Sequence, residues 1–269
     1  MEFVMELADL HFAVTYRHPD TLSRCRDYQI SAHAADPAPI AVCCDKEQYC
    51  RDMQSFAAQF PQPLTDSDRA KVHAYCEFIG IYRAICSRVL DYDGFMMHSA
   101  AVVLDGQAYL FCAPAGIGKT THAKLWCKKF GKRAYILNGD KPLIRRVGGQ
   151  WTVYGTPWCG KEGKQRNASA PLSGICFLKR GKNDRTYTPT ADEWIGLLLR
   201  QIYFPKKCDA PERLMILLND MMRATPAVCL EATPAQSAVC ASAAAFGIIC
   251  NGSSRCRAQQ QKGETIHEN

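Results

Sequence analysis

Residues 113–126, APAGIGKTTHAKLW, read as a glycine-rich loop that opens into a helix. The loop follows the phosphate-loop pattern G-x-x-x-x-G-K-[ST] over residues 113–120, with Ala113 in place of the first glycine. Gly116 and Gly118 suit backbone angles that turn N–H groups inward around phosphate oxygens. The helix that follows adds the positive end of its dipole at the same place. The stretch therefore predicts a site for the phosphates of a nucleotide.

The end of this loop carries the residues for charge and metal chemistry. Lys119 is expected to neutralise β- and γ-phosphate oxygens, and Thr120 to offer a small hydroxyl ligand to Mg²⁺. Thr121 and His122 fit as residues of the first helical turn, and Thr121 also falls within the stretch expected to contact nucleotide. The cofactor that this arrangement fits is ATP with Mg²⁺. The predicted nucleotide-contacting residues are Ala115, Gly116, Ile117, Gly118, Lys119, Thr120 and Thr121.

The segments on either side have the pattern that a phosphate loop requires, a strand before it and a helix after it. Residues 98–114 hold two short apolar runs joined by Asp105 and Gly106, a dipeptide that suits a tight hairpin turn. Residues 121–131 contain helix formers and end at Gly131, which suits a C-cap. Because the strand before the loop belongs to a hairpin, we expect at least part of the sheet to be antiparallel.

Short strands and helices are mixed through the rest of the chain, which predicts an α/β core. Residues 174–178, GICFL, are wholly apolar, as is typical of a central strand. Thr190 followed by Glu193 predicts a capping box at the start of a helix. The other predicted elements are a strand over 133–137, a hairpin over 143–155, helices over 190–203 and 210–222, a strand over 227–234 and a helix over 235–248.

Composition restricts the class of protein. The 269 residues are 47% hydrophobic and 22% charged, which is typical of a folded globular chain. Lys and Arg outnumber Asp and Glu by 33 to 26, but no stretch interleaves arginines with aromatics as nucleic-acid-binding surfaces do. We therefore expect phosphate or acidic partners in general and no nucleic-acid partner.

The N-terminal residues, the apolar runs and the cysteines indicate the cellular compartment. Residues 1–14, MEFVMELADLHFAV, carry acids where a secretory signal has basic residues, and no apolar run reaches the ~18 residues of a spanning helix. Fifteen cysteines are scattered without a C-x-x-C pair, which favours reduced structural thiols over a metal site. Cys159, in a glycine-flanked segment, is the one thiol that we mark for inspection. We expect a cytoplasmic protein with no membrane partner.

A phosphate loop needs a carboxylate nearby, to hold magnesium or to activate the acceptor. Asp140 stands just after the strand predicted over 133–137, in the stretch YILNGD. An aspartate there could also simply cap a turn. We favour the functional role because the end of a strand beside a phosphate loop is where such an acid is needed.

Residues 97–126, MHSAAVVLDGQAYLFCAPAGIGKTTHAKLW, and 137–142, LNGDKP, together resemble the HPr kinase/phosphorylase family. The chain looks most like the short HPr-kinase-like proteins found beside peptide-modification genes, some of which phosphorylate a serine of a precursor peptide. In that family a histidine precedes a hairpin that leads into the phosphate loop, and His98 stands at this position. The resemblance implies a fold related to ATP-dependent phosphoenolpyruvate carboxykinase, with His98 near the transferred phosphate.

Two features of the family guide the remaining assignments. Its members have a stretch similar to residues 155–161, GTPWCGK, and Lys161 is our candidate for neutralising charge during transfer. Two adjacent aspartates follow the strand in the family, whereas this chain has Gly139 and Asp140. Either Asp140 both orients magnesium and accepts the hydroxyl proton, or His98 is the base, or activity has been lost. The predicted catalytic residues are Asp140, His98, Lys119 and Lys161, and the predicted magnesium ligands are Thr120 and Asp140.

The sequence therefore predicts an ATP-dependent kinase of the HPr-kinase-like type, which transfers the γ-phosphate to a Ser or Thr hydroxyl of a peptide or protein. A kinase for an amino acid or other metabolite, and a nucleotide-binding regulator without catalysis, remain as alternatives. The oligomeric state is open, a homo-oligomer included.

The predicted fold is α/β, with an HPr kinase/phosphoenolpyruvate-carboxykinase-like P-loop core whose sheet is mixed and partly antiparallel. We assign residues 1–92 to a smaller N-terminal α+β subdomain that ends in a helix over 66–90 and could recognise the acceptor. Residues 93–250 are assigned to the P-loop kinase domain, and residues 251–269 to a polar C-terminal tail.

Overall fold

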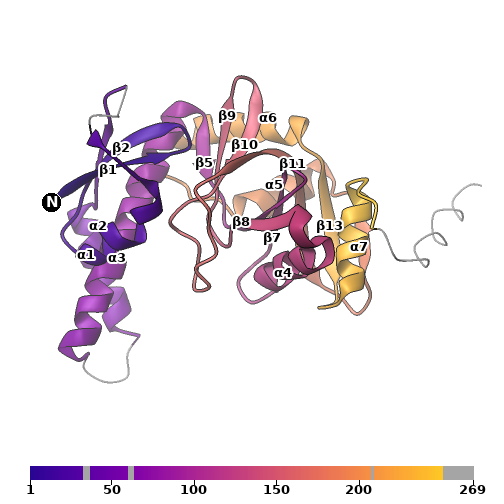
Figure 1. Ribbon diagram of the computed structural model, residues 1–269, viewed down its shortest axis with the longest axis horizontal. Coiled ribbons are helices and arrows are strands. Elements are labelled where there is room, and N and C mark those ends of the chain that lie inside the picture. Colours follow the sequence, from indigo (N-terminus) through magenta and orange to yellow (C-terminus); the bar gives the residue numbers. More distant parts are fainter. Residues whose placement is uncertain (33–36, 60–63, 207–208, 251–269) are drawn as a thin grey trace, which may run out of the picture.

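The computed structural model describes residues 1–32, 37–59, 64–206 and 209–250. Figure 1 shows a small N-terminal part on the left and a larger part on the right, with the upper end of the long helix α3 between them. The tail predicted over residues 251–269 lies outside the described residues.

A small sheet forms the N-terminal part. β1 (Glu2–Leu7) and β2 (Leu10–Thr15) make a hairpin whose turn residues, Ala8 and Asp9, both have positive φ. With β3 (Gln29–Ile30) and β4 (Ile40–Cys43), the described residues of this part make a four-stranded sheet in the order β3-β1-β2-β4. The sequence did not predict these strands, because an Ala-Asp turn lacks the usual glycine or asparagine of a tight hairpin.

Three helices accompany this sheet: α1 (Pro19–Arg24), α2 (Lys46–Ala57) and α3 (Asp66–Val89). α3 confirms the helix predicted over 66–90, and the Thr65 side chain caps it by accepting the Asp68 N–H. Its buried residues, such as Ile81 and Ile85, belong to one hydrophobic cluster with strands β1 and β2 and with Trp158 of the larger part. α3 therefore joins the two parts through a shared core.

The larger part is a mixed sheet. Its strands are β5 (Gly94–Met96), β6 (Ser99–Leu104), β7 (Gln107–Cys112), β8 (Ala134–Asn138), β9 (Leu143–Val147), β10 (Gln150–Tyr154), β11 (Ser169–Arg180), β12 (Arg185–Tyr187) and β13 (Ala227–Ala232). Across the described residues the sheet runs β5-β9-β10-β11-β7-β6-β8, with β13 also on β11 and β12 on β13. β11 pairs in parallel with β7 and β13, and the other pairs are antiparallel. The predicted α/β class with a mixed, partly antiparallel sheet is confirmed.

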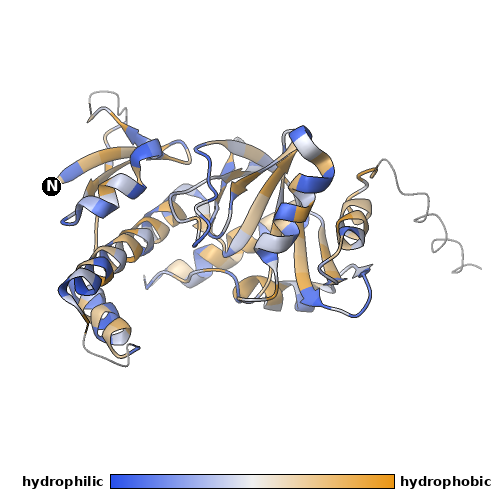
Figure 2. Ribbon diagram, turned by 60° about the horizontal axis from the view of Figure 1, so that its bottom comes forward, coloured by the Kyte–Doolittle hydropathy of each residue, from blue (hydrophilic) through white to orange (hydrophobic). Residues whose placement is uncertain are grey.

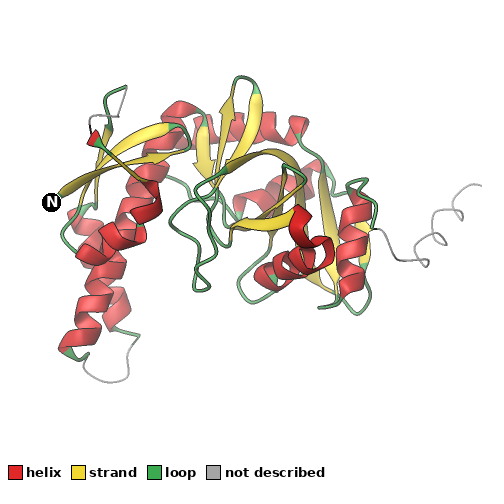
Figure 3. Ribbon diagram, in the orientation of Figure 1, coloured by secondary structure: helices red, strands yellow, loops and turns green. Residues whose placement is uncertain are grey.

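Helices cover both faces of this sheet. α5 (Ala191–Leu199) and α6 (Ala210–Ala224) pack on one face, against alternate residues such as Ala101 and Val103 of β6. α4 (Lys119–Phe130) and α7 (Gln236–Ala245) pack on the other face, against the intervening residues such as Ala100 and Val102. Figure 2 shows the hydrophobic strands between these helices, and Figure 3 shows α4 beside α7. β7, the strand that leads into the glycine-rich loop, is thus central and buried on both sides.

Two predicted helices are longer than the observed ones. The helix predicted over 190–203 ends at Leu199, because the residues beyond it turn to pair with the chain near β5: the Gln201 carbonyl accepts the His98 N–H at 2.6 Å. Thr190 accepts the Glu193 N–H as predicted, but the Glu193 carboxylate bonds Lys179 and Tyr187 instead of completing a capping box. The helix predicted over 235–248 is α7, Gln236–Ala245.

Candidate active site

Three strands bring separate parts of the sequence to one edge of the sheet. β6 begins where β7 and β8 end, and the antiparallel register sets Ser99 opposite Cys112, the last residue of β7. The Ser99 N–H donates to the Asp140 carbonyl, just beyond β8, at 3.0 Å. His98, directly before β6, therefore stands beside both the start of the glycine-rich loop and Asp140.

The glycine-rich loop folds around its own lysine. Gly116 and Gly118 have φ of 77° and 116°, and a Cβ on either would meet nothing within 4 Å, so the backbone angle rather than space requires glycine. Lys119, the first residue of α4, is only 8% exposed, and its Nζ donates to the Ala113 carbonyl at 2.7 Å. Burial lowers the pKa of Lys119, while the nearby Asp140 carboxylate acts in the opposite direction. A buried cation with one backbone partner is well suited to meet an anion.

Asp140 is held by its neighbours as an anion. Its Oδ1 lies 3.1 Å from His98 Nε2, and its Oδ2 accepts from Lys141 Nζ. Burial opposes ionisation, but the hydrogen bonds from His98 and Lys141 outweigh burial and lower the pKa of Asp140 to about 2. At neutral pH this carboxylate is therefore charged and is a weak proton acceptor.

Asn138 and Thr156 fix the position of this carboxylate, and sequence reasoning missed both. The Asn138 Oδ1 accepts the N–H groups of Asp140 and Lys141, each at 2.8 Å. Its Nδ2 donates to the carbonyl of Thr156 at 3.0 Å and to its Oγ1 at 3.1 Å, and that hydroxyl donates to the Lys141 carbonyl at 2.7 Å. Both side chains are fully buried. The available signal was an asparagine two residues before an acid, the usual start of an Asx turn.

A glycine-rich segment, residues 155–166, packs against the end of β8 and leaves no room for a second carboxylate. The Gly139 N–H donates to the Lys164 carbonyl at 2.9 Å. A Cβ at Gly139 would lie 2.8 Å from the Cys159 carbonyl, which is closer than real Cβ contacts. The packing of this segment against Gly139 therefore excludes an aspartate at position 139.

Lys161 lies on the same segment. Glu162 beside it pairs with Lys124 of α4 at 2.5 Å, which holds the segment against the first turns of that helix. Lys161 is exposed and makes no hydrogen bond or ion pair with any residue in the described ranges. Cys159 is half-buried, and burial raises the pKa of its thiol, so it stays protonated near neutral pH.

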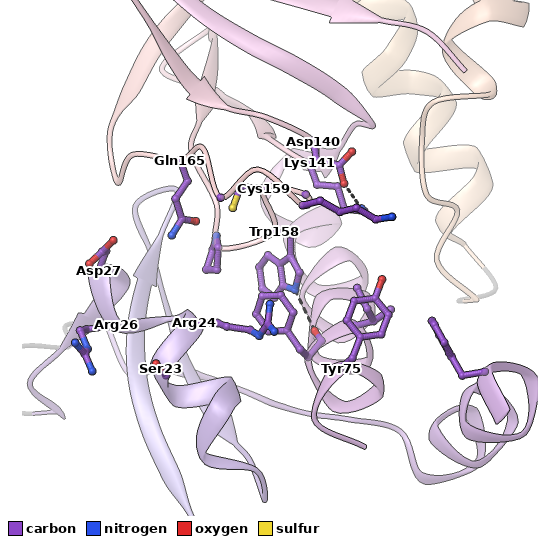
Figure 4. Close-up of a pocket in the computed structure, with 17 residues that line it drawn as sticks. Ser23, Arg24, Arg26, Asp27, Tyr75, Asp140, Lys141, Trp158, Cys159 and Gln165 are labelled. Carbon is purple, nitrogen blue, oxygen red and sulfur yellow. Dashed lines mark hydrogen bonds and ion pairs between the residues drawn. The ribbon is translucent and has the colours of Figure 1, made fainter. Parts of the chain in front are cut away.

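A cavity of about 1060 Å³ lies between the N-terminal part and this site. Figure 4 shows Trp158 at its centre, with Asp140 and Lys141 above it and Arg24 reaching toward it from the N-terminal part. From the larger part it is lined by Asp140, Lys141, Pro157, Trp158, Cys159, Gly160, Lys161, Gly163 and Gln165. From the N-terminal part it is lined by Ser23, Arg24, Arg26, Asp27, Phe56, Tyr75, Phe78 and Ile79.

Another cavity, of about 350 Å³, lies against the glycine-rich loop and does not share residues with the first. Its walls come from the loop after β7, from the carboxyl ends of β11 and β13 with the residues just beyond them, and from the first turns of α4. Arg180, the last residue of β11, donates to the Gly116 carbonyl at 2.9 Å and fixes the loop at this side. Ligands of α/β sheets bind at the carboxyl ends of parallel strands, which is where this cavity lies.

The structure brings most of the predicted residues together. Lys119, His98 and Asp140 share one edge of the sheet, and Lys161 lines the large cavity with Asp140. Thr120 is half-buried in the first turn of α4, and Thr121 is exposed at the smaller cavity.

His122 lies in the first turn of α4, as predicted. It is buried and bonds Trp126 and Ser242, and burial lowers its pKa to about 4.

The described residues lack two kinds of feature. None of their helices combines the length and apolar character needed to cross a bilayer. They also contain no group of three or more His, Cys, Asp or Glu side chains placed to hold a metal ion.

The sequence matches no family model and no curated protein. Among solved structures, the chain matches the HPr(Ser) kinase/phosphatase from Coxiella burnetii, with 14% identity over 48% of this chain and 92% of that chain, at a TM-score of 0.28. A likeness of this size is a distant one and does not assign the chain to that family, so the lineage stays a prediction from the sequence.

Proposed function

We propose that this chain is an ATP-dependent kinase that transfers the γ-phosphoryl group of ATP to a hydroxyl group. The observation that carries the proposal is the meeting of three elements at one sheet edge: the buried Lys119 of the glycine-rich loop, the ionised Asp140, and His98 bonded to it. Phosphoryl transfer needs mainly positioned charge and a group that accepts the hydroxyl proton. These residues supply both beside a large cavity.

The donor nucleotide binds through the loop. Backbone N–H groups at Gly116 and Gly118 and the N-terminus of α4 surround the phosphates. Lys119 Nζ exchanges the Ala113 carbonyl for a phosphate oxygen. The nucleoside occupies the smaller cavity, whose wall at Thr121 continues from the loop.

Thr120 and Asp140 would hold Mg²⁺, which would supply charge neutralisation on the phosphate oxygens. The donor set fits this ion, because Mg²⁺ in phosphate sites takes one or two carboxylates, with phosphates and waters as its other ligands. Lys141 must give up part of its contact with Asp140 Oδ2 for a cation to share that oxygen.

His98 accepts the proton of the acceptor hydroxyl. Its Nε2 faces Asp140 Oδ1 at 3.1 Å, which favours the tautomer with the proton on Nε2 and leaves the Nδ1 lone pair to accept a proton. Asp140, with its low pKa, orients His98 and stabilises the imidazolium that forms. Lys161, from the exposed segment, neutralises charge on the transferred group.

The acceptor enters through the large cavity. Its volume of about 1060 Å³ exceeds what one amino acid or small metabolite fills, and the N-terminal part supplies one whole wall. This favours a Ser or Thr of a peptide or protein over a small-molecule acceptor.

The test compares Lys119→Ala with Lys128→Ala, a matched loss of an exposed lysine on the same helix. Each protein receives ATP·Mg²⁺ and a library of serine- and threonine-containing peptides, and transferred phosphate is measured by mass spectrometry. Lys119→Ala should abolish transfer and the rise of Tm on addition of ATP·Mg²⁺, because the γ-phosphate loses its buried cation. Lys128→Ala should behave as the wild type.

Transfer by Lys119→Ala at the wild-type rate contradicts the proposal. ATP·Mg²⁺ binding by the wild type without turnover on peptides or metabolites would instead favour the non-catalytic regulator.

A further inference from the structure

The N-terminal wall of the large cavity presents an arginine whose guanidinium is held in place. Arg24 Nε donates to Asp20 Oδ2 at 2.6 Å, and the guanidinium carbon lies 5.2 Å from the centre of the Phe78 ring. The Arg24 side chain is still 47% exposed. One nitrogen and one ring face fix the group, and its two terminal nitrogens make no hydrogen bond with residues in the described ranges.

Such a guanidinium is prepared for a carboxylate. Two terminal nitrogens of arginine match the two oxygens of a carboxylate in a bidentate pair, which is among the stronger hydrogen-bonded interactions in proteins. Because Asp20 and Phe78 already restrict its rotamer, little side-chain entropy is lost on binding.

The surrounding wall is aromatic. Phe78 and Trp158 stack with centroids 5.2 Å apart, and the Trp158 ring N–H donates to the Phe78 carbonyl at 3.0 Å. Phe56 and Tyr75 meet edge to face at 5.1 Å. These rings join α2, α3 and the 155–166 segment into one surface that suits the side chains of an extended peptide rather than a compact polar metabolite.

The charged side chains that line the cavity favour an acidic ligand. Its described lining includes the cations Arg24, Arg26, Lys141 and Lys161 and the carboxylates Asp27 and Asp140. Asp140 is already bonded to Lys141, so the balance left for a ligand is positive.

We propose that the large cavity selects a peptide acceptor that carries a carboxylate near its phosphorylated hydroxyl, and that Arg24 is the residue that binds this carboxylate. The inference rests on the proposed kinase function. The carboxylate can come from an Asp or Glu side chain or from a peptide C-terminus, and the experiment separates these sources.

The experiment uses the full chain with ATP·Mg²⁺ and matched serine peptides. In one arm an Asp or its amide counterpart Asn is placed at each position around the serine in turn, with both peptide ends blocked. In the other arm the peptides lack internal acids and differ only in a free or amidated C-terminus. The variants are Arg24→Gln and, as the matched control, Arg69→Gln, an exposed arginine in the first turn of α3 that does not line the cavity.

In one of the two arms, the wild type and Arg69→Gln should phosphorylate the peptide with the carboxylate at least about tenfold better, in kcat/KM, than the matched peptide with the amide. This is the preference expected for a charge-assisted pair. In Arg24→Gln this ratio should fall to about one because kcat/KM for the carboxylate peptide falls, while the Kd for ATP stays as in the wild type.

Equal use of carboxylate and amide peptides by the wild type overturns the inference and leaves the kinase proposal intact. Retention of the preference in Arg24→Gln overturns the role of Arg24. Failure to phosphorylate any peptide, with ATP·Mg²⁺ binding intact, overturns the peptide assignment, whereas failure to bind ATP·Mg²⁺ overturns the proposed function itself.

Discussion

Asp140 illustrates how a single carboxylate can be kept charged in a partly buried place. Its side chain is 20% exposed, and its two oxygens contact His98 and Lys141. Its pKa falls to about 2 in the folded protein, against about 3.9 in an unfolded chain. The folded state therefore gains stability from the ionised form at any pH above the unfolded value.

Asp140→Asn keeps the shape of this side chain and removes its charge. We expect the free energy of unfolding to fall by about 2–3 kcal/mol at neutral pH, since a difference of nearly two pKa units corresponds to that amount. The gap between wild type and variant should close as pH falls from about 4 to about 2, because the wild-type carboxyl is then protonated too. Urea unfolding without Mg²⁺ at a series of pH values measures this. A gap independent of pH would contradict it.

The key element of the site is the glycine-rich segment, residues 155–166, which packs along the end of β8. It contacts Gly139 through the Cys159 and Lys164 carbonyls, and it carries Lys161 to the cavity. Gly139 does not need a special φ; it needs the absence of a side chain, because the atoms it meets are backbone. The position of this segment, and of Lys161 on it, therefore depends on the lack of a side chain at Gly139.

Gly139→Ala should destabilise the protein by about 1–3 kcal/mol, the usual cost of an added group in a tight contact. It should also lower kcat for phosphate transfer, because the segment that carries Lys161 must shift. The matched control is Gly196→Ala in α5, where a Cβ meets nothing within 4 Å; this change should be neutral or stabilising by up to about 1 kcal/mol. Thermal unfolding and steady-state transfer report both effects, and a Gly139→Ala protein as stable and active as the control would refute the argument.

The sequence predicted the parts of the site that depend on local patterns and missed those that depend on contacts between distant segments. The loop, its hairpin and Asp140 follow from local patterns of spacing and turn chemistry, so these positions were predicted. Asn138 and Thr156 act through hydrogen bonds across 18 residues, and Arg24 meets the site only because α3 joins the two parts. The strands of the N-terminal sheet were missed because the Ala8-Asp9 turn does not look like a hairpin turn.

In the folded molecule, one cavity adjoins the glycine-rich loop and a larger one adjoins Asp140. The smaller one meets the loop at Gly116, Gly118 and Thr121, while the larger one meets the His98–Asp140 edge. In the proposed kinase, a nucleotide whose base lies in the smaller cavity would direct its terminal phosphate toward the larger one. Donor and acceptor would then approach the transferred phosphate from different cavities, as transfer in line requires.

This arrangement predicts that a substitution in the smaller cavity can weaken binding of the nucleoside without changing binding of the phosphates. Ala232, half-buried at the end of β13, lines the smaller cavity, and Ala232→Phe should fill part of it. We expect this variant to bind ATP·Mg²⁺ at least about tenfold more weakly, because the phenyl ring occupies space that the base needs and the apolar contacts of the base with the cavity are lost. Binding of inorganic tripolyphosphate, which has no base, should not change.

Ala245→Phe, exposed on α7 outside the cavity lining, is the matched control and should leave both affinities unaltered. Isothermal titration of each protein with both ligands makes the comparison. If the wild type binds ATP no more tightly than tripolyphosphate, or if Ala232→Phe weakens both ligands equally with its fold intact, the base does not lie in this cavity.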